Sequence, residues 1–148
     1  MIKPAAGSLW VYHFAASSCS NCDMEILEIF TPGFDSERFG IKEALSIRHA
    51  DCLLVTGVLN PKSLSLLKKV RGEAPRPVKV AAVGTCALDT GIFRGSYNVL
   101  KPLDKYIPVD LYIPGCPPTP EALLSGLLGL YGKDKPGPGK RRKGRWIF

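Results

Sequence analysis

The sequence predicts an α/β domain with an open parallel sheet and helices on both faces. Four short runs of apolar, β-branched or aromatic residues alternate with helical patterns along the 148 residues. These runs are nearly continuous, as in strands that are buried on both faces. A strand–helix–strand–helix order is typical of a parallel sheet whose crossover helices cover both faces. The length fits one domain that buries its own core.

The four expected strands are short, and turn residues follow each of them. They span residues 9–15, 52–56, 78–83 and 109–113. The segment 31–49 contains Pro32, Gly33 and Gly40, so we expect a loop with a short helix there.

Three segments carry helical signals. Residues 22–30 place apolar side chains at helical spacing, namely Met24, Ile26, Leu27 and Phe30. Residues 61–70 follow Asn60, a good N-cap, with proline at the first helical position. The last helix is expected from Thr119 to about residue 131, with a stripe of leucines facing the core.

The net charge of +7 lies almost wholly in a tail. Residues 133–148 hold seven basic residues and one acid, which leaves residues 1–132 close to neutral. We therefore expect a domain over 1–132 and a flexible basic tail over 133–148. A domain so close to neutral argues against nucleic-acid binding as its role. The tail has charge and an apolar end that suit anionic lipid, while a solvated tail or one held by a neighbouring subunit is the alternative.

Neither a signal peptide nor an apolar run of about 20 residues is visible, so we expect a cytosolic protein. Five cysteines in such a chain indicate metal or redox chemistry before disulfides.

Four of the five cysteines follow the ends of expected strands. Cys19 and Cys22 follow the first strand, Cys86 the third and Cys116 the fourth. Because the carboxyl ends of parallel strands meet at one edge, residues 64 and 30 positions apart are expected to converge there. Cys52 lies inside a strand, where a cysteine is most often a small buried hydrophobic residue.

Converging thiolates have three main uses in a cytosolic protein. An iron–sulfur cluster takes four cysteines and suits loop geometry. Structural zinc also takes four, usually as two close pairs, but here only Cys19 and Cys22 form one. A thioredoxin-like dithiol would use that pair and leave Cys86 and Cys116 unexplained. The residues favour the cluster; zinc, a dithiol and structural coincidence remain as alternatives.

Glycine and proline surround these thiols. Gly84 and Gly115 precede Cys86 and Cys116, and glycine lets the backbone approach a bulky inorganic group. Pro117 and Pro118 stiffen the loop that holds Cys116.

The motifs around these cysteines resemble a known family. They are Cys19-Ser20-Asn21-Cys22-Asp23-Met24-Glu25, Glu37-Arg38-Phe39-Gly40, Arg48-His49-Ala50-Asp51, Gly84-Thr85-Cys86, Ile107-Pro108-Val109-Asp110 and Pro114-Gly115-Cys116-Pro117-Pro118. This set, which covers about residues 8–131, resembles the small subunit of membrane-bound, energy-converting nickel–iron hydrogenases. That subunit is similar to the 20-kDa iron–sulfur subunit of respiratory complex I.

The resemblance implies a flavodoxin-like fold with one 4Fe–4S cluster at the carboxyl edge, ligated by Cys19, Cys22, Cys86 and Cys116. Two departures bear on the branch of the family. Complex I subunits have adjacent cysteines at the first site, whereas here two residues separate Cys19 from Cys22. Asn21 stands where the hydrogenase pattern has glycine, and asparagine tolerates left-handed backbone well.

The implied function is a one-electron relay that is not catalytic alone. Its implied partners are a catalytic large subunit, a ferredoxin-like iron–sulfur subunit and membrane-embedded subunits, at the cytoplasmic face of the membrane. The alternatives are the same role in a membrane-bound sulfane reductase or in a quinone-reducing complex I. From a different class, a zinc-stabilised or thiol-redox binding module is a further alternative.

Four polar residues near these motifs can be given a role. Related complexes keep an acid at the position of Glu25, so Glu25 is the candidate for proton transfer. Asp23 is interpreted as an acid favoured by the dipole at a helix start. His13 and His49 are interpreted as packed or capping histidines, and neither is assigned to the cluster.

Overall fold

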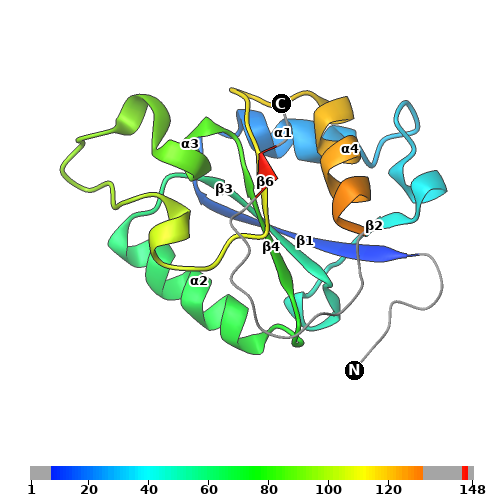
Figure 1. The fold of residues 1–148 in the computed structure, drawn as a ribbon, viewed down its shortest axis with the longest axis horizontal. Coiled ribbons are helices and arrows are strands. Elements are labelled where there is room, and N and C mark those ends of the chain that lie inside the picture. The colour runs from blue at the N-terminus through cyan, green and yellow to red at the C-terminus, as the bar shows by residue number, and fades with distance from the viewer. Residues whose placement is uncertain (1–7, 132–144, 147–148) are drawn as a thin grey trace.

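Six parallel strands form one open sheet in the computed structural model, which describes residues 8–131 and 145–146 (Figure 1). The strand order is β2-β1-β3-β4-β5-β6. The strands are β1 Leu9–Ser17, β2 Ile41–Glu43, β3 Cys52–Gly57, β4 Lys79–Val83, β5 Leu111–Ile113 and β6 Arg145–Trp146. The helices are α1 Asn21–Glu28, α2 Pro61–Glu73, α3 Thr85–Asp89 and α4 Pro120–Tyr131. The predicted open parallel α/β sheet is therefore confirmed.

Helices cover both faces of the sheet. Figure 1 shows α1 and α4 on one side and α2 on the other. The central strands explain this arrangement, because their successive side chains enter opposite cores. In β3, Leu53 and Val55 join the core that contains α2, whereas Cys52 and Leu54 join the core that contains α1 and α4. Every residue of β3 is buried, as the continuous apolar run predicted.

Two helix starts form as their sequences indicate. The side chain of Asn60 accepts a hydrogen bond from the Ser63 amide at 2.8 Å, and the Ser63 hydroxyl lies 2.9 Å from the Asn60 amide, which completes a capping box. Thr119 Oγ1 accepts from the Ala122 amide at 3.3 Å. The leucine stripe of α4 is buried through Leu123, Leu124 and Leu127.

Besides β6, which lies in the expected tail, two short elements were not predicted. β2 lies inside the segment expected to be a loop, where it pairs with the start of β1 from Leu9↔Ile41 to Val11↔Glu43. The helix α3 follows β4 directly and contains Cys86. Both are too short to show a periodic pattern, since β2 has three residues and α3 has five.

The buried face of α1 differs from the expected one. Its buried residues are Cys22 and Ile26, with Ile29 just beyond its end, whereas Met24 and Leu27 are exposed. Helical spacing shows which residues share a face, but this short helix has two apolar faces, one with Cys22 and Ile26 and one with Met24 and Leu27. The stripe that contains Cys22 packs on the sheet.

Most of the expected basic tail lies outside the described residues. This applies to residues 132–144 and 147–148, so the predictions of flexibility and lipid contact remain predictions. The backbone of β6 pairs with β5 at Leu111↔Arg145 and Tyr112↔Trp146. In the described ranges, no helix combines the length and apolar composition that a membrane crossing requires.

Candidate metal centre

The structure places the four predicted cysteines at the carboxyl edge of the sheet. Cys19 lies in the turn after β1, and Cys22 lies in the first turn of α1. Cys86 is the second residue of α3, directly after β4, and Cys116 follows β5. Cys19 and Cys116 are exposed, Cys86 is partly buried and Cys22 is buried; all four are free thiols.

The electrostatics of Cys22 link all four thiols. The pKa of Cys22 is raised to about 11, first by burial and then by the neighbouring Cys19, Cys86, Asp23 and Cys116. Burial also raises the pKa of Cys86, with added contributions from Cys116 and Cys19. One thiolate raises the pKa of another thiol in this way only when the two lie close together. The fold therefore brings together thiols from three loops.

Gly84 provides space for the sulfur of Cys22. Its φ is +82°, and a Cβ at this position would lie only 2.6 Å from Cys22 Sγ. Gly91 approaches Cys86 in a similar but looser way, with a Cβ position 3.4 Å from Cys86 Sγ. Glycine was expected here so that the backbone could come close to an inorganic group. In the structure, the group nearest to Gly84 is a cysteine sulfur.

Hydrogen bonds join the loop that carries Cys86 to the loop that carries Cys116. The Gly84 amide donates to the Ile113 carbonyl at 2.9 Å, and the Thr85 amide donates to the Gly115 carbonyl at 2.9 Å. The Thr85 hydroxyl donates to the same Gly115 carbonyl at 3.1 Å. These bonds fix the relative positions of two segments that lie 30 residues apart.

Asp23 joins the third loop to the sheet. Its carboxylate accepts a hydrogen bond from the Thr56 hydroxyl at 2.6 Å and another from the Ser18 hydroxyl. His13 Nε2 lies 3.0 Å from Asp23 Oδ1 and 3.1 Å from Thr56 Oγ1. Burial alone would raise the pKa of Asp23, but the hydrogen bonds from Ser18 and Thr56 and the nearby His13 outweigh it and lower the pKa. Asp23 therefore does more than interact favourably with the helix dipole: it also bonds the turn after β1 to β3.

A second set of contacts supports the same loop from β3. Gly57 has a φ of +79°, and a Cβ there would lie 2.6 Å from the Ser17 carbonyl carbon and 2.7 Å from the Ser18 amide nitrogen. The Asn60 amide group donates to Ser17 Oγ at 2.7 Å. The chain leading to Cys19 is therefore held against the end of β3.

The donor set fits a multi-iron cluster better than a single metal ion. Among the residues that the structure describes, no three His, Cys, Asp or Glu side chains are grouped so that they could hold one ion. Structural zinc needs four ligands on one ion. A 4Fe–4S cluster takes four cysteines on different irons and accepts thiolates spread around a larger volume. The four thiols suit that group, and Gly84 makes room for the sulfur of one of them, Cys22.

The remaining candidates lie apart from this thiol set. Cys52 is fully buried in β3, and burial raises its pKa to about 12, so its interpretation as a buried hydrophobic residue is confirmed. His49 is exposed at the end of the 3₁₀ turn Ile47–His49. Glu25 is partly buried in α1 and makes no hydrogen bond or ion pair with any described residue. Its proposed role in proton transfer stays a prediction.

Sequence reasoning missed the polar cluster of His13, Asp23 and Thr56. Its members come from β1, α1 and β3, and Thr56 lies 33 positions from Asp23. One signal was available: a histidine and a threonine interrupt two apolar strands, and buried polar groups need partners.

Comparison with known proteins agrees with this geometry. Residues 19–130 match the family model described as NADH ubiquinone oxidoreductase, 20 Kd subunit. The probable membrane-bound hydrogenase subunit mbhJ of Pyrococcus furiosus is 47% identical over 121 residues, which cover 82% of this chain and 72% of that protein.

Solved structures extend the similarity. A chain of the membrane-bound sulfane sulfur reductase, an archaeal respiratory membrane complex, is 41% identical with a TM-score of 0.74, covering 85% of this chain and 70% of that one. A chain of an NAD⁺-reducing [NiFe]-hydrogenase has a TM-score of 0.65 at 20% identity, covering 93% of this chain and 99% of that one, and supports the fold alone. The resemblance expected from the cysteine motifs is confirmed: the chain belongs to the NADH ubiquinone oxidoreductase 20-kDa subunit family.

Proposed function

We propose that the chain is the electron-relay subunit of a membrane-bound hydrogenase complex related to complex I. In this proposal Cys19, Cys22, Cys86 and Cys116 hold one 4Fe–4S cluster at the carboxyl edge of the sheet. The observation that carries it is the convergence of these cysteines, from the loops after β1, β4 and β5, on one edge of the sheet, where a Cβ on Gly84 would lie 2.6 Å from Cys22 Sγ. The similarity to mbhJ supports the assignment to a hydrogenase complex.

A flavodoxin-like description of the fold is part of this proposal. The first five strands follow the order β2-β1-β3-β4-β5, which is the order of flavodoxin-like sheets. In such sheets ligands bind outside the carboxyl ends of the strands. The expected position of the cluster follows that rule.

A 4Fe–4S cluster, when bound, accepts and releases one electron at a time. The residues of the chain hold its ligands in place. Gly84 leaves room for the buried sulfur of Cys22, and Asp23 fixes the turn that carries Cys19. The raised pKa of Cys22 means that its thiol must lose a proton when it becomes a ligand.

Exposed apolar residues beside the cysteines support contact with another subunit. Met24 and Leu27 are exposed on α1, and Ile92 and Tyr97 are exposed in the segment after α3. Exposed large apolar side chains are typical of interaction sites. We assign these side chains to contact with the catalytic large subunit. A ferredoxin-like iron–sulfur subunit and membrane-embedded subunits complete the proposed complex, with this chain peripheral on the cytoplasmic side.

A sulfane sulfur reductase complex is the second candidate because of the 41% identity to a chain of that complex. The same relay role in a quinone-reducing complex I is a third. A zinc-stabilised module has less support, because the described side chains form no site for a single ion. A thiol-redox module would use Cys19 and Cys22 and leave Cys86 and Cys116 without a role.

The relay role is tested by comparing the purified intact complex with a complex that carries a cysteine variant. We expect Cys116→Ala to remove one reduced-cluster signal from the electron paramagnetic resonance spectrum and to stop turnover. Proton reduction and sulfane sulfur reduction, assayed side by side, separate the first two candidates. Hydrogen evolution or uptake by the purified polypeptide alone would contradict the proposal.

Glu25 is proposed to carry protons near the interface. Glu25→Gln should slow turnover of the complex and leave the cluster spectrum unchanged. Loss of the cluster in this variant would instead show a structural role.

A further inference from the structure

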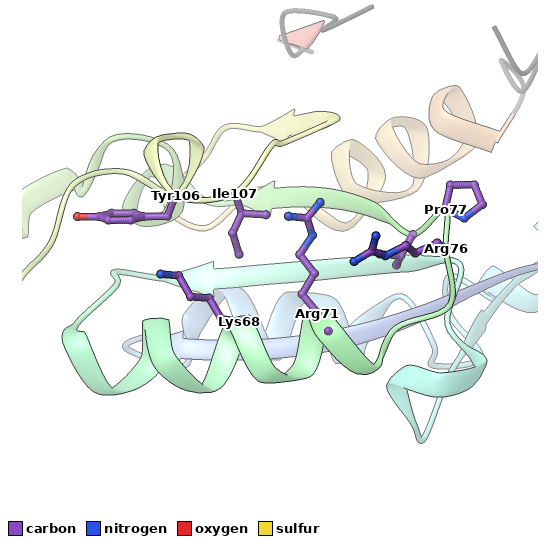
Figure 2. A pocket seen from close by; sticks show the side chains of 8 residues that line it. Lys68, Arg71, Arg76, Pro77, Tyr106 and Ile107 are labelled. Carbon is purple, nitrogen blue, oxygen red and sulfur yellow. The ribbon is translucent and has the colours of Figure 1, made fainter. Parts of the chain in front are cut away.

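A cavity of about 510 Å³ opens at the edge of the sheet opposite to the cysteines (Figure 2). It lies between the C-terminal half of α2 and the segments that precede β4 and β5. Lys68 and Arg71 of α2 line it together with Arg76, while Val78, Tyr106 and Ile107 supply apolar surface. Because these segments lead into the amino ends of the strands, the cavity is separate from the metal centre.

The charge around this cavity is unbalanced. Its lining includes three cations and no acid. Residues 8–131 as a whole contain equal numbers of basic and acidic residues, so this concentration is local. The nearest acid along α2, Glu73, is 3.3 Å from Arg48.

None of the three cations has an ion pair within the described part of the chain. Figure 2 shows Lys68 and Arg71 extending from α2 toward Tyr106 and Ile107, with Arg76 on the same side of the cavity. Like charges that share a partly enclosed space repel one another, and an anion between them relieves that repulsion. The chain's own tail is basic and has the wrong sign for this role.

The chemistry of the lining selects a class of ligand. Arginine presents a planar fork that matches phosphate oxygens, and lysine binds phosphate as a point charge. Val78, Ile107 and the ring of Tyr106 provide surface for an apolar or aromatic group. The volume lies within the range of small-molecule pockets. We propose that this cavity binds a phosphate ester that carries an apolar or aromatic moiety, either free in solution or as a phospholipid headgroup.

Two probes distinguish the two sources. Adenosine monophosphate, titrated calorimetrically into the full chain, represents a free phosphate ester. Co-sedimentation with vesicles that contain phosphatidylglycerol in phosphatidylcholine represents the headgroup. The test variant is Arg71→Gln with Arg76→Gln. The control is Lys62→Gln with Lys69→Gln, which removes the same charge from exposed positions on α2 outside the cavity.

We expect the arginine variant to bind at least one probe about tenfold more weakly than the wild type, and the lysine control to change binding less than about twofold. Any vesicle binding by the basic tail is the same in both variants. Loss of only the nucleotide or only the vesicle binding identifies the source.

No binding of either probe to the wild type, or equal losses in both variants, would overturn the proposal. If the glutamine variant fails to fold, Arg71→Lys with Arg76→Lys keeps the charge and should still weaken binding through loss of the forks. Iron content should not change in any of these variants, so this test is independent of the proposed relay role.

Discussion

The backbone of Gly84 faces the sulfur of Cys22 so closely that a Cβ at position 84 would lie 2.6 Å from Cys22 Sγ. This contact joins the end of β4 to the first turn of α1, two segments 62 positions apart. It places the most buried of the four thiols beside the loop that leads to Cys86.

Gly84→Ala should therefore displace Cys22 and reduce the iron bound per chain by more than half. Gly95→Ala is the matched control, because Gly95 has the same φ of +82° but nothing within 4 Å of its Cβ position. Both variants carry the strain of a positive φ, about 1–3 kcal/mol, and only the first meets the sulfur. Equal iron content in the two variants would show that the contact does not matter for the site.

Asp23→Asn should destabilise the fold by about 2 kcal/mol at neutral pH, because the charged carboxylate accepts hydrogen bonds from Ser18 and Thr56. Since the pKa of Asp23 is lowered in the folded state, its stabilisation is complete above the pKa of the unfolded chain. The stabilisation is lost as pH falls through the lower, folded pKa. Denaturant unfolding across pH 2–7 measures the difference between the wild type and the variant.

The exposed acid Glu121 in the first turn of α4 gives a control for Asp23. Glu121→Gln should cost at most about 0.5 kcal/mol. A similar cost for both variants would mean that Asp23 acts only through the helix dipole, as the sequence alone had suggested.

The five thiols of the metal-free, reduced chain should react with iodoacetamide at very different rates. Cys19 and Cys116 are exposed and should react first. Cys22 is buried with its pKa raised to about 11, so little of it is thiolate at pH 8 and it should react slowly. Cys52 is fully buried with a pKa of about 12 and should react only after unfolding. Peptide mass spectrometry gives the order, and early labelling of Cys52 would contradict the burial described here.

Ile92→Asp should weaken co-purification of the large subunit about tenfold or more, because a charge would enter the proposed interface. Ile92 is 88% exposed in the free chain, so folding and iron content should not change. Leu45→Asp is the control, since Leu45 is 94% exposed and lies between β2 and the turn that precedes β3. Equal retention of the large subunit by both variants would place the interface elsewhere.

The parts of the fold that the sequence predicted well have strong local signals. The strands around Leu53 and Ala81 were found because both faces are buried, which produces continuous apolar runs. The start of α2 was predicted because Asn60 caps the helix and Pro61 occupies its first turn, and both signals can be read from neighbouring residues alone. The edge strand β2 was missed, since Ile41 is its only buried residue.

The candidate site also divides into features with a local sequence signal and features that depend on tertiary packing. The positions of the cysteines follow from strand ends, so their common edge was predictable. The contacts of Asp23 with His13 and Thr56 depend on how two strands and a helix pack, and no short-range pattern contains that information. The exposed face of α1, with Met24 and Leu27, also depends on which stripe packs on the sheet.

Iron and acid-labile sulfide analysis of the anaerobically purified chain, followed by electron paramagnetic resonance of the reduced protein, tests the central claim most directly. The wild type and Cys52→Ala should each contain about four irons and show one 4Fe–4S signal, whereas Cys116→Ala should lose most of both. A colourless wild-type chain that carries zinc, or equal iron loss in Cys52→Ala and Cys116→Ala, would contradict the account.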